Sequence, residues 1–87
     1  MYVVIGGAGN AGLYLGRQLR QRGHEVAFVE QDGNAATEAS AVDALVVEGD
    51  VRDIDALLEA GIDRSHYYIG TVTRDSDNLV SCALANY

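Results

Sequence analysis

Three glycines near the start of the chain have the spacing of a phosphate-binding turn. Gly7, Gly9 and Gly12 fit the pattern G-x-G-x-x-G within the run YVVIGGAGNAG. In such a turn the first glycine permits a tight bend, the second lets the backbone approach a pyrophosphate, and the third brings a helix onto a strand. The following helix offers unpaired N–H groups and the positive end of its dipole. The pattern favours a nucleotide site over a simple strand ending.

An acidic residue stands where the sugar of such a ligand is expected. Glu30 lies 18 residues after Gly12 and closes the second predicted strand, close to the spacing of about 20 residues typical of dinucleotide-binding folds. A carboxylate there accepts hydrogen bonds from the ribose hydroxyls and repels a 2′-phosphate. NAD or an adenine nucleotide is therefore favoured over NADP. The alternative is a solvated acid at the end of a strand.

The sequence lacks the residue patterns of metal sites, reactive thiols and P-loop hydrolases. There is no C-x-x-C motif, and His24 and His66 are isolated, so we expect no metal site. Cys82 has apolar neighbours on a predicted helix and is expected to be a core thiol. The chain contains no lysine, which excludes the phosphate-binding loop of P-loop hydrolases. We expect no catalytic residues in this chain.

The composition is that of one small globular domain. The chain has 87 residues, of which 48% are hydrophobic, and its net charge of −7 argues against nucleic acid as a partner. No apolar run approaches the roughly 20 residues of a membrane span. Met1 leads directly into a strand, leaving no room for a signal peptide, and the single cysteine suggests a reducing compartment. We therefore expect a cytoplasmic domain.

The elements that position the candidate residues alternate between strand and helix. Right-handed crossovers predict an α/β fold with a Rossmann-like parallel sheet in the order 3-2-1-4, and a ligand crevice above the carboxyl ends of strands 1 and 4. Strand 4 would keep a free edge, so we expect residues 1–87 to be a truncated Rossmann domain or half of a larger assembly. The predicted strands are Tyr2–Ile5, His24–Glu30, Ala44–Val47 and His66–Gly70. The predicted helices are about Ala11–Arg22, Asp32 or Asn34 to Ala39, Asp53 to Gly61, and a last one from Asp75 or Ser76.

A family pattern emerges when the motifs are combined. The glycine turn, Glu30, Gly49-Asp50, and the span from Ala60-Gly61-Ile62 to Asp75-Ser76-Asp77-Asn78-Leu79 resemble the N-terminal nucleotide-binding domain of the TrkA family. This domain, also called the RCK or KTN domain, belongs to regulators of potassium transport. The resemblance implies binding of NAD(H) or of ATP, ADP or AMP. It also implies homo-oligomers at the cytoplasmic face of the membrane that regulate a potassium channel or transporter subunit.

Carried over position by position, the resemblance implies a set of ligand-contacting residues. The glycine turn would cradle the diphosphate, Glu30 would hold the adenosine ribose, and Asp50 with Val51 would flank the adenine. The turn after the fourth strand would close on the rest of the ligand. The candidate binding residues are Gly7, Ala8, Gly9, Asn10, Ala11, Gly12, Glu30, Asp50, Val51, Thr71, Val72 and Thr73.

Two positions depart from the family's usual pattern. The threonine usual in the turn after the fourth strand falls on Val72, with a threonine on either side. Arg52 stands where small or hydroxyl residues are common. It could reach a phosphate or pair with Asp53 or Asp55, and pairing is the favoured interpretation.

Two other functions compete with the regulatory one. Residues 6–12 also fit the G-x-x-G-x-x-G pattern of extended short-chain dehydrogenases and epimerases, and residues 49–53 look like their segment after the third strand. Those enzymes use a Tyr-x-x-x-Lys pair for proton transfer, and no lysine is present. The other alternative is an assembly module that has lost its ligand, against which the joint presence of the glycines, Glu30 and Asp50 argues.

Overall fold

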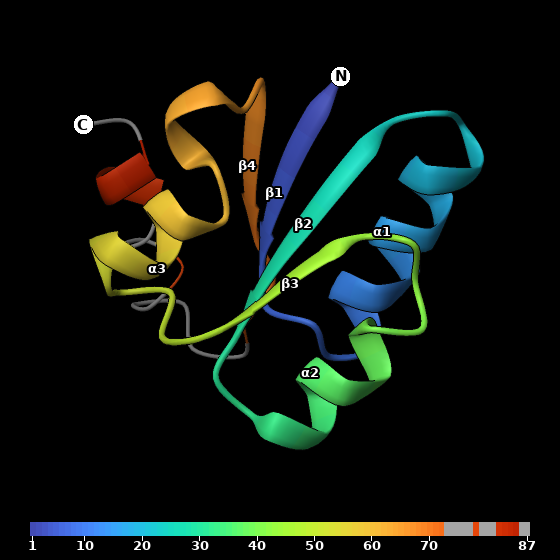
Figure 1. Ribbon diagram of the computed structural model, residues 1–87, viewed down its shortest axis with the longest axis horizontal. Helices are drawn as coiled ribbons and strands as arrows, with labels where there is room; N and C mark the ends of the chain where they lie inside the picture. The colour runs from blue at the N-terminus through green and yellow to red at the C-terminus, as the bar shows by residue number, and fades with distance from the viewer. Residues whose placement is uncertain (73–77, 79–81, 86–87) are drawn as a thin grey trace.

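The computed structural model describes residues 1–72, 78 and 82–85. Its four parallel strands form one sheet in the order β3-β2-β1-β4 (Figure 1). The strands are β1 (Tyr2–Gly6), β2 (Glu25–Glu30), β3 (Leu45–Glu48) and β4 (Tyr67–Gly70). They are connected by α1 (Asn10–Gln21), α2 (Gly33–Ala39), α3 (Ile54–Glu59) and the short 3₁₀ helix η1 (Ile62–Arg64). The predicted fold class and strand order are confirmed.

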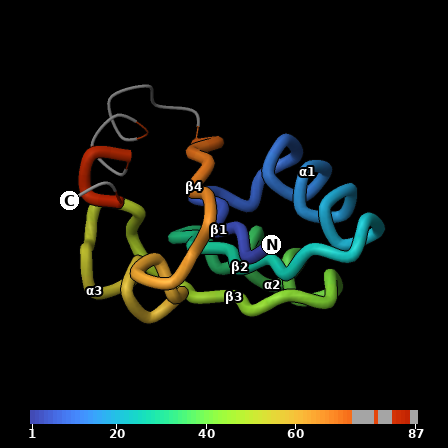
Figure 2. Tube along the Cα trace, turned by 90° about the horizontal axis from the view of Figure 1, so that it is seen from above, coloured from blue at the N-terminus to red at the C-terminus, as the bar shows by residue number. Residues whose placement is uncertain are grey.

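Helices cover both faces of the sheet. Figures 1 and 2 show α1 and α2 on one face, and α3 with the helical residues 82–85 on the other. Alternate residues of β1 point to opposite faces, so Ile5 packs with Phe28 on the α1 side and Val4 packs with Leu57 on the α3 side. Because both faces are buried, β1 and β2 have almost continuous apolar sequences.

Close packing of α1 on the sheet depends on a missing side chain. A Cβ at Gly16 would overlap the ring of Phe28, a fully buried side chain of β2. The helix can therefore lie nearer to the sheet at Gly16 than a larger residue would permit.

Most predicted boundaries lie within one or two residues of the observed ones. β1 extends through Gly6, and β4 begins at Tyr67, one residue later than predicted. Gly61, with a φ of 88°, adopts the left-handed conformation just after α3, as its position predicted. The predicted start of the last helix at Asp75 or Ser76 lies outside the described residues. No helix in the described part of the chain has both the length and the hydrophobicity of a membrane span.

Candidate nucleotide-binding site

The glycine turn joins β1 to α1 and is fixed by contacts within the fold. Gly7 has a φ of 110°, which favours glycine, and its N–H donates to the Val29 carbonyl at 2.8 Å. A Cβ at Gly12 would overlap the carbonyl oxygen of Gly7. Gly12 therefore lets the first turn of α1 lie directly against the glycine turn. As predicted, Gly7 permits the tight bend and Gly12 permits the close approach of the helix.

Gly9 differs from the other two glycines because the fold does not require it. Its φ of −73° is accessible to any residue, and a Cβ there would meet nothing within 4 Å. Gly9 is exposed, as are Asn10 and Ala11 beside it. Neither the backbone conformation nor the packing of the described residues calls for glycine at this position.

The start of α1 leaves backbone donors available. The first bond of the helix runs from the Leu13 N–H to the Gly9 carbonyl at 2.9 Å, so three amides precede it without a helical acceptor. Within the described residues no side chain caps this end, and the first turn carries no acid. These amides and the helix dipole together favour an anion such as a phosphate.

The carboxylate of Glu30 connects two loops at the carboxyl end of the sheet. Its Oε1 accepts a hydrogen bond from the Ala8 N–H at 2.6 Å, and its Oε2 accepts one from the Asp32 N–H at 2.8 Å. Each oxygen of an ionised carboxylate has a second lone pair for a further donor. Glu30 can therefore hold the glycine turn and accept hydrogen bonds from a diol simultaneously.

The segment after β4 contacts the glycine turn from the opposite side. The Thr71 N–H donates to the Gly6 carbonyl at 2.8 Å, and the Thr71 hydroxyl lies 3.0 Å from the Gly7 carbonyl. Val72 is held by Asn78, whose Oδ1 accepts from the Val72 N–H and whose Nδ2 donates to the Val72 carbonyl. Thr73 lies outside the described residues, so its predicted role stays a prediction.

These elements enclose a cavity of about 260 Å³ at the carboxyl ends of β1, β2 and β4. The strand order reverses between β1 and β4, and this switch point is where ligands bind in open parallel sheets. Two lining residues were not predicted, Asp32 and Ala35; both lie at the start of α2, just after the strand that ends in Glu30. The lining residues are Gly7, Gly9, Glu30, Asp32, Ala35, Thr71 and Val72.

Asp50 and Val51 do not line this cavity in the described structure. Val51 is 5% exposed and packs in the core on the α3 side of the sheet. The Asp50 carboxylate accepts from the Arg52 Nε at 3.1 Å and from another guanidinium nitrogen at 2.7 Å. Hydrogen bonds from Arg52 hold the pKa of Asp50 below its usual value. The place of both residues beside an adenine stays a prediction.

The predicted partners of Arg52 were wrong. The guanidinium pairs with Asp50, two residues before it, whereas Asp53 or Asp55 was expected. The Arg52 backbone N–H also donates to Asp50 at 2.9 Å. This turn brings the two side chains together, whereas the Asp53 carboxylate is used to cap α3.

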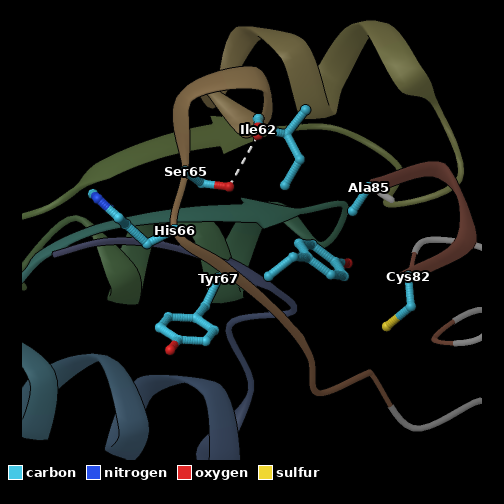
Figure 3. A pocket seen from close by; sticks show the side chains of 7 residues that line it. Ile62, Ser65, His66, Tyr67, Cys82 and Ala85 are labelled. Carbon is cyan, nitrogen blue, oxygen red and sulfur yellow. Dashed lines mark hydrogen bonds between the residues drawn. The ribbon is translucent and has the colours of Figure 1, made fainter. Parts of the chain in front are cut away.

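A second cavity, of about 270 Å³, lies away from the glycine turn (Figure 3). It is formed where η1, the edge strand β4 and the helical residues 82–85 meet, and the half-buried thiol of Cys82 lies on its wall. No group of acidic, histidine and cysteine side chains in the described residues could hold a metal ion. None of the predicted ligand contacts falls in this cavity, which is lined by Ile62, Ser65, His66, Tyr67, Tyr68, Cys82 and Ala85.

Comparison with known proteins identifies the family. A family model described as the TrkA-N domain matches residues 3–87. The chain belongs to the TrkA-N domain family. The resemblance stated from the sequence motifs is therefore confirmed.

Curated relatives of this TrkA-N domain are longer proteins. The chain is 38% identical to the Trk system potassium uptake protein TrkA homolog of Pyrococcus abyssi, covering 100% of this chain and 39% of the relative. It is 41% identical to the protein of the same name from Methanothermobacter thermautotrophicus, covering 97% of this chain and 39% of the relative. The domain thus spans about two fifths of the length of these relatives.

A solved structure supports the fold. The Shewanella denitrificans Kef CTD in AMP-bound form matches with a TM-score of 0.84 and 24% identity, covering 99% of this chain and 52% of that one. At this identity the match supports the Rossmann-like architecture alone.

Proposed function

We propose that this TrkA-N domain binds an adenine nucleotide, NAD(H) or ATP, ADP or AMP, and that binding regulates potassium transport. One observation carries the proposal: a single cavity is lined both by Gly9, at the uncapped start of α1, and by Glu30, whose carboxylate accepts from the glycine turn. A phosphate at the helix amides would place the attached ribose near Glu30. The adenine would then extend toward Asp50 and Val51, as the family resemblance implies.

Charge on the cavity wall favours a ribose without a 2′-phosphate. Glu30 and Asp32 both line the cavity, and their carboxylates repel a further anion. The free ribose hydroxyls can instead donate to Glu30. We therefore expect NAD to bind more tightly than NADP.

The relatives suggest the biological role. Their names place them in Trk potassium uptake systems, and the Kef neighbour was solved with AMP bound. We infer that this domain works in the cytoplasm as part of a homo-oligomer at the inner face of the membrane, bound to a potassium channel or transporter subunit. Nucleotide binding would shift the conformation of that partner through a coupling free energy of about 1–3 kcal/mol.

Catalysis is not part of the proposed function. The dehydrogenase alternative needs a Tyr-x-x-x-Lys pair, and the sequence contains no lysine. Among the described cavity-lining residues, the polar side chains are Glu30, Asp32 and Thr71, and the Thr71 hydroxyl lies near two backbone carbonyls. The site is therefore better suited to ligand binding than to proton transfer.

Titration calorimetry with AMP, ADP, ATP, NAD, NADH and NADP tests the binding step. We expect Glu30→Gln to weaken NAD binding about tenfold, because an amide accepts fewer and weaker hydrogen bonds than a carboxylate. The same change should reduce the preference for NAD over NADP. Glu59→Gln, on an exposed acid at the end of α3, is the matched control. Absence of heat and thermal shift with every nucleotide would favour the assembly-module alternative.

Potassium uptake in cells carrying the full-length protein tests the regulatory step. Glu30→Gln should change the nucleotide dependence of uptake while the transporter remains present at the membrane. If the variant lost nucleotide binding but potassium uptake stayed unchanged, the proposed coupling would be contradicted. The proposed binding site would not be.

A further inference from the structure

The side chain of Asn78 forms the hydrogen bonds to Val72 that the backbone of a neighbouring strand would otherwise form. Its Oδ1 accepts from the Val72 N–H at 3.0 Å, and its Nδ2 donates to the Val72 carbonyl at 2.8 Å. A carboxamide has the same donor and acceptor groups as a peptide unit. Asn78 therefore pairs with both backbone polar groups of Val72 just after β4 has ended.

The strand before this contact leaves room for the carboxamide. A Cβ at Gly70 would lie 2.8 Å from Asn78 Oδ1 and 3.1 Å from its Cγ. Gly70 does not have a positive φ, so its backbone conformation does not call for glycine. The space occupied by Asn78 gives an independent reason for glycine at the last position of β4.

The residue held by Asn78 packs against the glycine turn. A Cβ at Gly7 would lie 3.0 Å from Val72 Cγ1 and 3.1 Å from the Val72 nitrogen. The adjacent Thr71 bonds to the carbonyls of the same turn through its N–H and its hydroxyl. The position of the segment after β4 thus limits the positions that the glycine turn can adopt.

We propose that Asn78 is a positioning residue of the nucleotide site, acting through Val72 and Thr71 on the glycine turn without touching the ligand. This inference rests on the proposed function. Removal of the carboxamide frees the Val72 backbone and lets the wall of the cavity move. The amides at the start of α1 then lose their fixed relation to Glu30, and ligand affinity falls because the geometry must be restored on binding.

Three variants test this role in calorimetry with AMP and NAD. Asn78→Ala should weaken both ligands about tenfold or more, and Gly70→Ala should do the same by pushing the carboxamide away. Gln21→Ala, which removes an exposed carboxamide at the far end of α1, should leave both affinities unchanged. Should Asn78→Ala fail to fold, Gly70→Ala carries the same test.

Amide hydrogen exchange without nucleotide separates positioning from general stability. In Asn78→Ala the Val72 amide should exchange about tenfold faster or more, while β2 amides such as that of Phe28 keep their protection. Equal acceleration across the sheet would overturn the positioning role. Wild-type affinity in folded Asn78→Ala, with nucleotide still bound by the wild type, would overturn this inference alone. A wild-type protein that binds no nucleotide would overturn the proposed function as well.

Discussion

The starts of α1 and α3 use their backbone amides differently. Asp53 caps α3 by accepting from the Asp55 N–H at 2.9 Å, and Asp32 caps α2 in the same way. The longer α1 has Gly9 at its N-cap position and no side-chain cap in the described residues. All three helices follow strands of the same parallel sheet, so the difference does not come from topology. The two short helices use carboxylates for local stability, whereas the first amides of α1 have no side-chain cap in the described residues, as the proposed nucleotide site requires.

The largest effect should come from closing the space between α1 and the glycine turn. In Gly12→Ala the new Cβ would overlap the Gly7 carbonyl oxygen, a backbone atom that can move only with the whole turn. We expect a loss of about 3 kcal/mol in the free energy of unfolding, the upper range for overpacking, together with lost nucleotide binding. Urea unfolding monitored by circular dichroism measures the change in the free energy of unfolding. An unchanged unfolding midpoint would show that α1 is packed less tightly than described.

Gly9→Ala should separate binding from folding. The Cβ meets nothing within 4 Å and the φ of −73° suits alanine, so the free energy of unfolding should stay the same or rise by about 0.5 kcal/mol. A phosphate at the helix amides would collide with the new methyl group. Calorimetry should show nucleotide affinity reduced about tenfold or more, equivalent to ~1.4 kcal/mol. Full affinity in Gly9→Ala would place the ligand elsewhere.

Loss of a helix cap should have the opposite effect, a lower stability with unchanged nucleotide affinity. Asp53→Ala removes the cap of α3 and should lower the free energy of unfolding by about 1 kcal/mol. Nucleotide affinity should be unchanged, because Asp53 does not line the cavity of the glycine turn. Urea unfolding and calorimetry on the same samples measure both quantities. If Asp53→Ala lowered nucleotide affinity without lowering stability, the start of α3 would also serve ligand binding, and the contrast with α1 would be wrong.

Local sequence signals predicted most of the fold. Apolar runs such as Val3–Ile5 and cap residues such as Asp32 act within a few positions of themselves, so their structural effects can be read from neighbouring residues. The rule that crossovers are right-handed then restricts the sheet to essentially one strand order. Boundary differences, such as β4 beginning at Tyr67, reflect hydrogen bonding at strand ends.

Contacts between distant segments were harder to predict. The bond from the Ala8 N–H to Glu30 spans 22 residues and depends on how two loops meet at the sheet edge. The sequence indicates Asn78 only as part of a family motif, because its contact with Val72 depends on the path of the chain after β4. The Arg52 partner was missed although it is local. Its choice of Asp50 over Asp53 depends on turn geometry and on the use of Asp53 as a cap.

The smallest expected change in stability comes from breaking the ion pair between Asp50 and Arg52 before α3. Hydrogen bonds from Arg52 lower the pKa of Asp50, so the pair stabilises the folded state at pH values above the usual aspartate pKa. This stabilisation is lost as the pH falls through the lowered pKa. Arg52→Ala should return the pKa of Asp50 toward its usual value and cost at most about 1 kcal/mol at neutral pH, since the pair is partly solvated.

Carboxyl-carbon NMR titration of Asp50 in both proteins measures this shift directly. Arg52→Gln, which keeps a hydrogen-bond donor but loses the charge, shows how much of the lowering comes from hydrogen bonding. The side-chain hydrogen bond is the largest cause of the lowered pKa, and the backbone N–H of residue 52 remains in every variant. The glutamine variant should therefore keep more of the lowering than the alanine variant, which keeps only the part due to the backbone N–H. An Asp50 pKa that is the same in all three proteins would mean that the pair does not persist in solution. The Asp50 carboxylate would then be available to a ligand, while Asp53 would still cap α3.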